Sequence, residues 1–190
     1  MTSDTASSGM PAYGEAIIEK ARGITFLALD VDGVMTDGSL IFSASGDELK
    51  AFNILDGLGL KQAMAAGIEV AVITGRRSPL TERRMTSLGI TTLLQGREDK
   101  LTALREVMAA HQLDPAQVAY IGDDLPDLAA IRYAGLGVTV ANGHWFVRQH
   151  ADVCTRATGG SGAVRELTDL LLHARGRLAG ELQTWLGESR

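Results

Sequence analysis

The sequence has a single cysteine, Cys154, and it has no stretch that is dense in positive charge. One cysteine can form neither a disulfide within the chain nor a cysteine-based zinc site, which favours a reducing compartment such as the cytoplasm. The formal net charge is -5 at pH 7. Because nucleic acid and anionic membrane surfaces bind clustered Lys and Arg, neither is expected as a partner of this chain.

Long apolar runs and metal-like histidine patterns are also missing. No run reaches the roughly 20 apolar residues that a membrane-spanning helix needs, and the first dozen residues lack the basic start and apolar stretch of a signal peptide. The four histidines have no metal-like spacing with acidic residues. What is present is 45% hydrophobic content in 190 residues, which is enough for one domain with a substantial core.

Short apolar runs alternate with helical patterns along most of the chain. Runs at 24–29, 70–73, 118–121 and 136–140, with a weaker one at 92–94, predict buried parallel strands. Helical patterns lie at 58–66, 79–88, 100–111, 125–133 and 163–186. This alternation predicts an α/β fold, a Rossmann-like three-layer sandwich with a parallel sheet, in which ligands bind beyond the carboxyl ends of the strands.

One segment, 39–53, interrupts this alternation. It has two short strand-like runs around a Ser-Gly-Asp turn, which predicts a β-hairpin insertion after the first strand. We therefore expect a flexible N-terminal tail at 1–15, one folded domain at 16–180 that carries the hairpin at 39–53, and a C-terminal tail at 181–190.

The first candidate site is the pair Asp30 and Asp32, which follows the strand at 24–29. Alternation along extended backbone points both carboxylates the same way, and Gly33 allows a sharp turn. Beside a divalent cation, Asp30 could act as a nucleophile toward phosphorus, while Asp32 gives a proton to the leaving oxygen and later takes one from water. Asp-x-Asp also occurs in ordinary turns and calcium loops, so the other motifs of the chain must decide whether this pair is catalytic.

Three further motifs supply that context. Thr74, Gly75 and Arg76 follow the strand at 70–73 and could cradle phosphate, although the same residues could merely make a turn. Lys100 could neutralise a phosphoryl group or remain a solvated surface lysine. The acids of the Gly122–Asp127 motif, which are Asp123, Asp124 and Asp127, suit hard magnesium, and Asp124 could also cap a helix.

The order of these four motifs resembles the haloacid dehalogenase superfamily of phosphatases, and the short hairpin in place of a cap domain resembles its capless subclass. The wording DVDGVMTDG, ELKAFNILDGLGL, VAVITGR, YIGDDLPD and GGSGAVRE is similar to the phosphatases of 3-deoxy-D-manno-octulosonate 8-phosphate. The resemblance covers residues from about 24 to 175. It implies magnesium-dependent hydrolysis of that sugar-acid phosphate through an aspartyl-phosphate, in lipopolysaccharide precursor synthesis.

The resemblance also implies a role for each matching residue. Asp30 is the nucleophile and a magnesium ligand, Asp32 is the general acid and base and gives its backbone carbonyl to the metal, and Asp123 is the third protein ligand. Thr74 and Lys100 hold the phosphoryl oxygens, with Gly75 and Arg76 beside them. Asp124 and Asp127 support the site. Members of the subclass are homotetramers in which the hairpin of one subunit closes the site of the next.

One position departs from the pattern of the resemblance. Leu55 precedes Asp56-Gly57 at a place where many members of the resembled family carry a basic residue. Loss of that cation would weaken recognition of a sugar carboxylate, because a buried anion needs a charged or hydrogen-bonding partner. Arg76, Arg84 and Arg156 are the candidates to replace it.

Two alternative functions remain open at this stage. A related nonulosonate 9-phosphate phosphatase would share every catalytic residue. A non-enzymatic phosphate-receiver switch domain also gathers acids, a hydroxyl and a lysine at a sheet edge. The order of motifs argues against the receiver, which would place its phosphate-accepting aspartate after a central strand and an acid pair after the first strand.

Overall fold

A six-stranded sheet forms the centre of the protein in a computed structural model that describes residues 10–187. The strand order is β5-β4-β1-β6-β7-β8, and every neighbouring pair is parallel. The strands are β1 (Phe26–Leu29), β4 (Glu69–Thr74), β5 (Thr92–Gln95), β6 (Val118–Gly122), β7 (Leu136–Thr139) and β8 (Val153–Cys154). The prediction of a parallel sheet is confirmed, and all five predicted strands are present within one or two residues of their expected ends.

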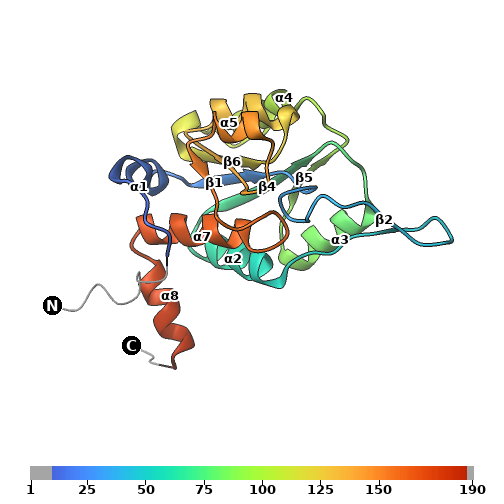
Figure 1. Ribbon diagram of the computed structural model, residues 1–190. Coiled ribbons are helices and arrows are strands. Elements are labelled where there is room, and N and C mark those ends of the chain that lie inside the picture. Colours follow the sequence, from blue (N-terminus) through green and yellow to red (C-terminus); the bar gives the residue numbers. More distant parts are fainter. Residues whose placement is uncertain (1–9, 188–190) are drawn as a thin grey trace.

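Helices cover both faces of this sheet (Figure 1). One face packs against α1 (Glu15–Arg22), α2 (Ile54–Ala65), α3 (Pro79–Leu88) and α7 (Ala163–Ala174). The other face packs against α4 (Lys100–Ala110), α5 (Leu128–Tyr133) and α6 (Trp145–Arg148). A short 3-10 helix, η1 (Pro115–Gln117), precedes β6. The three-layer α/β sandwich predicted from the sequence is therefore confirmed.

The two cores explain why the central strands are apolar throughout. In β1, Leu27 and Leu29 belong to the core under α2 and α7, whereas Phe26 and Ala28 belong to the core under α4 and α5. Successive side chains of a strand point to opposite faces, so a strand that is covered on both faces reads as a continuous apolar run.

The chain changes direction across the sheet at β1. It passes from β1 to β4 and β5 on one side, and then returns to place β6, β7 and β8 on the other side. A crevice forms outside the carboxyl ends of the strands at such a switch point, which is where open α/β sheets bind ligands. Asp30, the first residue after β1, stands at this position.

The hairpin predicted at 39–53 is present. Its strands, β2 (Ile41–Phe42) and β3 (Glu48–Leu49), pair in antiparallel fashion and extend away from the body of the protein (Figure 1). Ile41, Phe42 and Leu49 expose 46%, 59% and 52% of their surface. Because three large apolar side chains lie exposed on one short hairpin, this element presents an apolar surface to its surroundings.

Some elements differ from the sequence prediction. The helix expected at 163–186 is two helices, α7 and α8 (Leu178–Trp185), because Gly176 has a left-handed φ of 67° between them. Helix α8 crosses the boundary expected at 181. The helix expected at 125–133 begins with a 3-10 turn, η2 (Leu125–Asp127). Helix α1 begins at Glu15, within the predicted tail, of which residues 1–9 lie outside the described part. Within residues 10–187, no helix has the length and apolar character needed to cross a membrane.

Candidate active site

A cavity of about 550 Å³ lies at the carboxyl ends of β1, β4 and β6. All nine residues singled out from the sequence line it, together with Glu98 and Pro126, which the sequence analysis did not select. The nine are Asp30, Asp32, Thr74, Gly75, Arg76, Lys100, Asp123, Asp124 and Asp127. The structure therefore brings together four motifs that are separated by long stretches of chain.

The turn after β1 aims Asp30 and Asp32 into the cavity. Val31, between them, is fully buried in the core, so the two acids lie on the opposite side. Gly33 follows with a φ of 89°, a conformation that favours glycine. A Cβ at Gly33 would also collide with the Asp123 carboxylate. Glycine thus allows the β1 and β6 loops to approach each other.

Lys100 is the buried cation of the site. It begins α4, it is only 3% exposed, and its Nζ lies 2.7 Å from Asp30 Oδ1 and 3.3 Å from Asp127 Oδ1. The same ammonium donates a hydrogen bond to the carbonyl oxygen of Ile73 at 2.8 Å. Because a buried ammonium needs such partners, the interpretation of Lys100 as a solvated surface lysine is excluded.

Asp127 is fully engaged by donors from its own chain. Its Oδ1 accepts a hydrogen bond from the Tyr120 hydroxyl at 2.7 Å, and its Oδ2 accepts from the backbone N–H groups of Asp123 at 3.3 Å and Asp124 at 3.4 Å. With Lys100 added, both carboxylate oxygens have partners. This arrangement favours a supporting position for Asp127, and it identifies Tyr120 as a contributor that the sequence analysis missed.

Burial and mutual repulsion shape the protonation of the acids. Burial, and next the charge of Asp127, raise the pKa of Asp30 to about 6, although Lys100 acts in the opposite direction. Burial, followed by the charges of Asp127, Asp30 and Asp124, raises the pKa of Asp123 to about 7. Both carboxyl groups therefore need added positive charge to remain ionised together at neutral pH.

The donor set fits a magnesium ion. Asp30, Asp123 and Asp127 each offer a carboxylate oxygen, and these three oxygens lie within 4.8 Å of one another. Magnesium prefers oxygen ligands and commonly takes one or two carboxylates while keeping several waters. Since Asp127 is occupied by donors, Asp30 and Asp123 are the carboxylates best placed to receive the ion.

The remaining cavity residues come from the β4 loop and the β6 loop. Thr74 ends β4 and is almost fully buried, while Gly75 and the exposed Arg76 continue the cavity wall. Asp124 caps η2 by accepting a hydrogen bond from the N–H of Leu125 at 2.8 Å. The capping interpretation of Asp124 is thus confirmed, and it is compatible with a place at the cavity.

A second lysine contacts the site and was not selected from the sequence. Lys50 directly follows β3 and forms an ion pair with Asp32 Oδ1. Its neighbour Glu48 accepts a hydrogen bond from Arg76 Nη2 at 2.9 Å. The only sequence signal was a lone lysine in the run ELKAF, because a separation of 18 positions between Asp32 and Lys50 hides their contact.

Of the three arginines proposed to replace a cation near Leu55, only Arg76 lines the cavity. Arg84 donates a hydrogen bond to the carbonyl oxygen of Asn53 at 3.2 Å and stacks over Phe52, while the backbone N–H of Arg156 bonds Glu166. Leu55 lies in the first turn of α2 and is 54% exposed. Its side chain therefore lies on the surface of the subunit.

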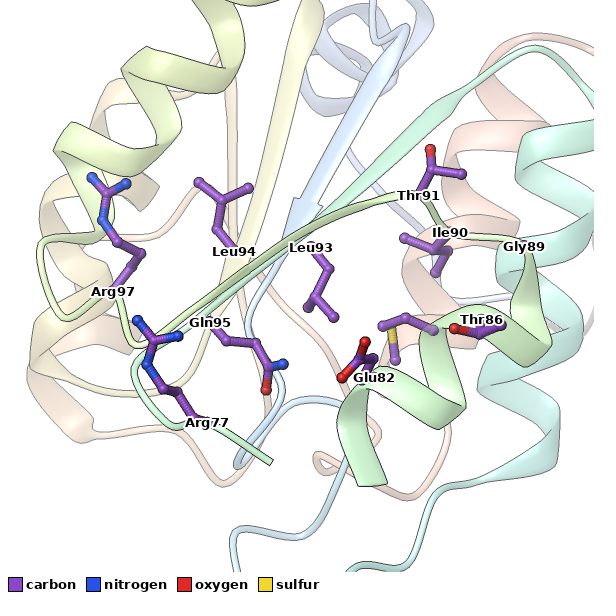
Figure 2. A pocket seen from close by; sticks show the side chains of 11 residues that line it. Arg77, Glu82, Thr86, Gly89, Ile90, Thr91, Leu93, Leu94, Gln95 and Arg97 are labelled. Carbon is purple, nitrogen blue, oxygen red and sulfur yellow. The ribbon is translucent and has the colours of Figure 1, made fainter. Parts of the chain in front are cut away.

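A larger hollow, of about 740 Å³, lies between α3 and β5 (Figure 2). Its charged side chains include Arg77, Glu82 and Arg97. Arg97 is already held by Asp99 at 2.8 Å and Glu106 at 2.6 Å. This hollow has none of the clustered buried acids of the smaller cavity, so the chemistry favours the cavity at the strand ends.

Known proteins resemble this chain over most of its length. A family model described as haloacid dehalogenase-like hydrolase matches residues 90–167. The 3-deoxy-D-manno-octulosonate 8-phosphate phosphatase KdsC of Yersinia pestis is 49% identical over 86% of this chain and 88% of that protein. Its namesake from Escherichia coli K12 is 48% identical over 85% of this chain and 86% of that protein.

A solved structure agrees with these relatives. The 3-deoxy-D-manno-octulosonate 8-phosphate phosphatase of Moraxella catarrhalis, in complex with a magnesium ion, a phosphate ion and KDO, has a TM-score of 0.89 and 44% identity. The match covers 91% of this chain and 99% of that one. By its sequence, its fold and its strand-end cavity, the chain belongs to the haloacid dehalogenase-like hydrolases, in the family of the 3-deoxy-D-manno-octulosonate 8-phosphate phosphatases.

Proposed function

We propose that this protein is a magnesium-dependent phosphoric monoester hydrolase that converts 3-deoxy-D-manno-octulosonate 8-phosphate to the free sugar acid and phosphate, in lipopolysaccharide precursor synthesis. The observation that carries the proposal is the buried Asp30 carboxylate beside Lys100, in a cavity that Thr74 and Asp123 also line. A carboxylate, a cation, a hydroxyl and a second acid converging on one cavity suit transfer of a phosphoryl group. The family relationship supports the choice of substrate.

In the first step, a carboxylate oxygen of Asp30 attacks phosphorus. A bond forms between that oxygen and phosphorus, the bond from phosphorus to the sugar oxygen breaks, and Asp32 donates a proton to the departing oxygen. Thr74 and the backbone at Gly75 hold the phosphoryl oxygens, and Lys100 balances their charge while keeping Asp30 in place. The product of this step is an aspartyl-phosphate on Asp30.

In the second step, water attacks the phosphorus of the aspartyl-phosphate. Asp32 takes a proton from the water, phosphate leaves, and the Asp30 carboxylate is restored. Asp30, Asp123 and the backbone carbonyl of Asp32 would hold magnesium, which supplies positive charge that stabilises the phosphoryl oxygens. Asp124 and Asp127 support this arrangement, Asp127 through its hydrogen bonds to the β6 loop.

The proposal includes a homotetramer, in which the exposed hairpin of each subunit contacts another copy of the chain. Ile41, Phe42 and Leu49 present exposed apolar surface next to the base of the hairpin, from which Lys50 reaches Asp32. A second copy of the chain would bury this surface and bring its own side chains over the cavity, where the sugar must be recognised. Elution of the purified protein as a monomer with full activity would contradict this assembly. The single cysteine suits a cytoplasmic site for the reaction.

The direct test measures phosphate release across a panel of octulosonate, nonulosonate and aryl phosphates, with magnesium and with chelator. We expect release to require magnesium and to be fastest with the octulosonate ester. Asp30→Asn should lower kcat by roughly 10⁴-fold or more, the scale on which loss of a nucleophile acts. Asp114→Asn is the matched control, since Asp114 is exposed and caps only η1.

Each outcome bears on a separate part of the proposal. Activity that survives Asp30→Asn would overturn the nucleophile assignment. Similar rates for all three classes of ester would overturn the named substrate, and faster release from the nonulosonate ester would favour the related phosphatase. Stable phosphorylation without release of phosphate would favour a receiver switch domain.

A further inference from the structure

The base of the hairpin lies against the acid that the proposed mechanism uses for proton transfer. Lys50, immediately after β3, is an ammonium whose side chain is only 3% exposed, and it pairs with Asp32 Oδ1. The ammonium also lies 3.8 Å from Glu48 Oε1, and Glu48 in turn accepts from Arg76 at 2.9 Å. Three consecutive contacts therefore join the hairpin to the Asp32 carboxylate and the β4 loop.

The two oxygens of Asp32 are in different situations. Oδ1 accepts the hydrogen bond from Lys50, whereas Oδ2 is buried and accepts no hydrogen bond from any residue that the structure describes. The Nε of Arg76 lies 3.9 Å from Oδ2, which is beyond hydrogen-bond range. A buried carboxylate oxygen without a donor is costly, so its position calls for a partner that arrives with the substrate.

Free rotation about the Cβ–Cγ bond would let an unrestrained aspartate exchange its two oxygens, because this torsion has a broad, two-fold preference. Lys50 removes that freedom, since turning the carboxylate would break its ion pair. A group that transfers a proton must lie within hydrogen-bond reach of the reacting oxygen in a defined orientation.

We propose that Lys50 is a positioning residue of this enzyme, which holds Asp32 Oδ1 so that Asp32 Oδ2 faces the leaving oxygen of the sugar. The inference rests on the acid-base role proposed for Asp32. It gives the hairpin a function within its own subunit, in addition to the closure of a neighbouring site. Lys50 acts through Asp32 and forms no bond to the phosphoryl group.

The test uses two leaving groups that differ in their need for a proton. A sugar alkoxide is a poor leaving group and requires protonation, whereas a nitrophenolate leaves without it. With the full-length protein and magnesium, Lys50→Met should lower kcat for octulosonate 8-phosphate by about 10²-fold, the low end of what a general acid contributes. The same change should slow the release of nitrophenolate from p-nitrophenyl phosphate in the first turnover by less than about 5-fold, since that step needs no acid for this leaving group.

Two further variants complete the experiment. Lys50→Arg keeps a cationic donor, so its kcat for the sugar phosphate should be about ten-fold or more above that of Lys50→Met. Lys61→Met removes an exposed lysine from α2 and should leave kcat unchanged for both substrates. Magnesium binding, measured as the rise in melting temperature on addition of the ion, should be the same in wild type and Lys50→Met.

Several results would overturn the inference. A slowing of first-turnover nitrophenolate release that equals the loss of kcat for the sugar phosphate would identify a general structural role, and so would loss of folded protein in both Lys50→Met and Lys50→Gln. An unchanged kcat for the sugar phosphate in Lys50→Met would remove any role for the contact. Failure of the proposed function is read separately, from wild-type protein that releases no phosphate from either ester.

Discussion

The edge of the sheet that carries Asp30 and the hairpin that carries Phe42 are built on opposite principles. At the sheet edge, Lys100, Asp30 and Asp127 are buried, and the Lys100 ammonium contacts both carboxylates and the carbonyl oxygen of Ile73. On the hairpin, the large apolar side chains are exposed. The buried ion pairs of the first region form within one subunit, whereas the apolar side chains of the second lie exposed on the surface of that subunit.

This difference separates the two parts of the proposed reaction. Groups that handle the phosphoryl moiety must be fixed closely, and a buried network on strand ends achieves that. Recognition of the sugar can be left to surface that assembly completes. Lys50 connects the two regions, because it lies at the base of the hairpin and its ammonium forms an ion pair with Asp32.

The largest effect is expected for Lys100→Met, which removes the cation of the buried cluster at the sheet edge. Asp30 and Asp127 would remain buried without their cation, so the free energy of unfolding should fall by about 3 kcal/mol at pH 8. Lys100 lowers the pKa of Asp30, so its loss raises that pKa further. Proton uptake by Asp30 then relieves the repulsion as pH falls, and the destabilisation should be smaller at pH 5.

Urea denaturation of wild type, Lys100→Met and the exposed control Lys61→Met at both pH values would measure this effect. Equal stability of Lys100→Met and wild type at pH 8 would contradict the buried ion pair. Release of phosphate should also be lost in Lys100→Met while it persists in Lys61→Met.

Removal of magnesium should affect the same region next most strongly. The raised pKa values of Asp30, about 6, and Asp123, about 7, mean that the metal-free folded protein binds more protons than the unfolded chain. The stability that these two groups contribute is therefore fully present below about pH 4, near the ordinary pKa of aspartate, and is lost as pH rises through 6 to 7. Magnesium at about 100 times its Kd should raise Tm by about 5–10 °C at pH 8 and by less at pH 5.

Scanning calorimetry with magnesium and with chelator at the two pH values would check this prediction. Asp123→Asn should reduce both the rise in Tm and its dependence on pH. A rise in Tm that is the same at pH 5 and pH 8 would show that these carboxyl groups do not compete for protons and metal.

A change on the hairpin should spare the fold and affect assembly. In Phe42→Ser, the stability of the single subunit should stay within about 0.5 kcal/mol of wild type, because the side chain is exposed. The dissociation constant of the assembly should rise at least about ten-fold if Phe42 is a central interface contact. Light scattering over a range of concentrations would measure this change, and Ala44→Ser, at an exposed position of the same hairpin, is the control. An unchanged assembly would place the interface elsewhere.

The smallest effect is expected at Leu55, where the resemblance seen in the sequence led us to expect a basic residue. Leu55→Arg should leave stability within about 0.5 kcal/mol of wild type, because the side chain is exposed. It should lower KM for the sugar-acid phosphate by about 2- to 10-fold, the size of one charged contact, and leave KM for an aryl phosphate unchanged. Leu55→Gln is the uncharged control. An equal change for both substrates would separate Leu55 from recognition of the sugar carboxylate.

Much of the fold was readable in the sequence because its signals are local. The strands of the sheet are buried on both faces and therefore appear as short apolar runs, and the hairpin has a turn motif between two strand-like runs. Helix ends were less predictable. The break at Gly176 depends on a single left-handed residue, and the amphipathic pattern continues on both sides of it.

The sequence by itself determined the motifs that reach the cavity, because residues directly after parallel strands must meet at one edge of the sheet. Only the tertiary structure decided how they divide their tasks. Tyr120 and two backbone N–H groups occupy Asp127, and Lys50 holds one oxygen of Asp32. These contacts link residues through folded loops, and whether a carboxylate receives a metal or a hydrogen bond depends on the donors that three dimensions bring to it.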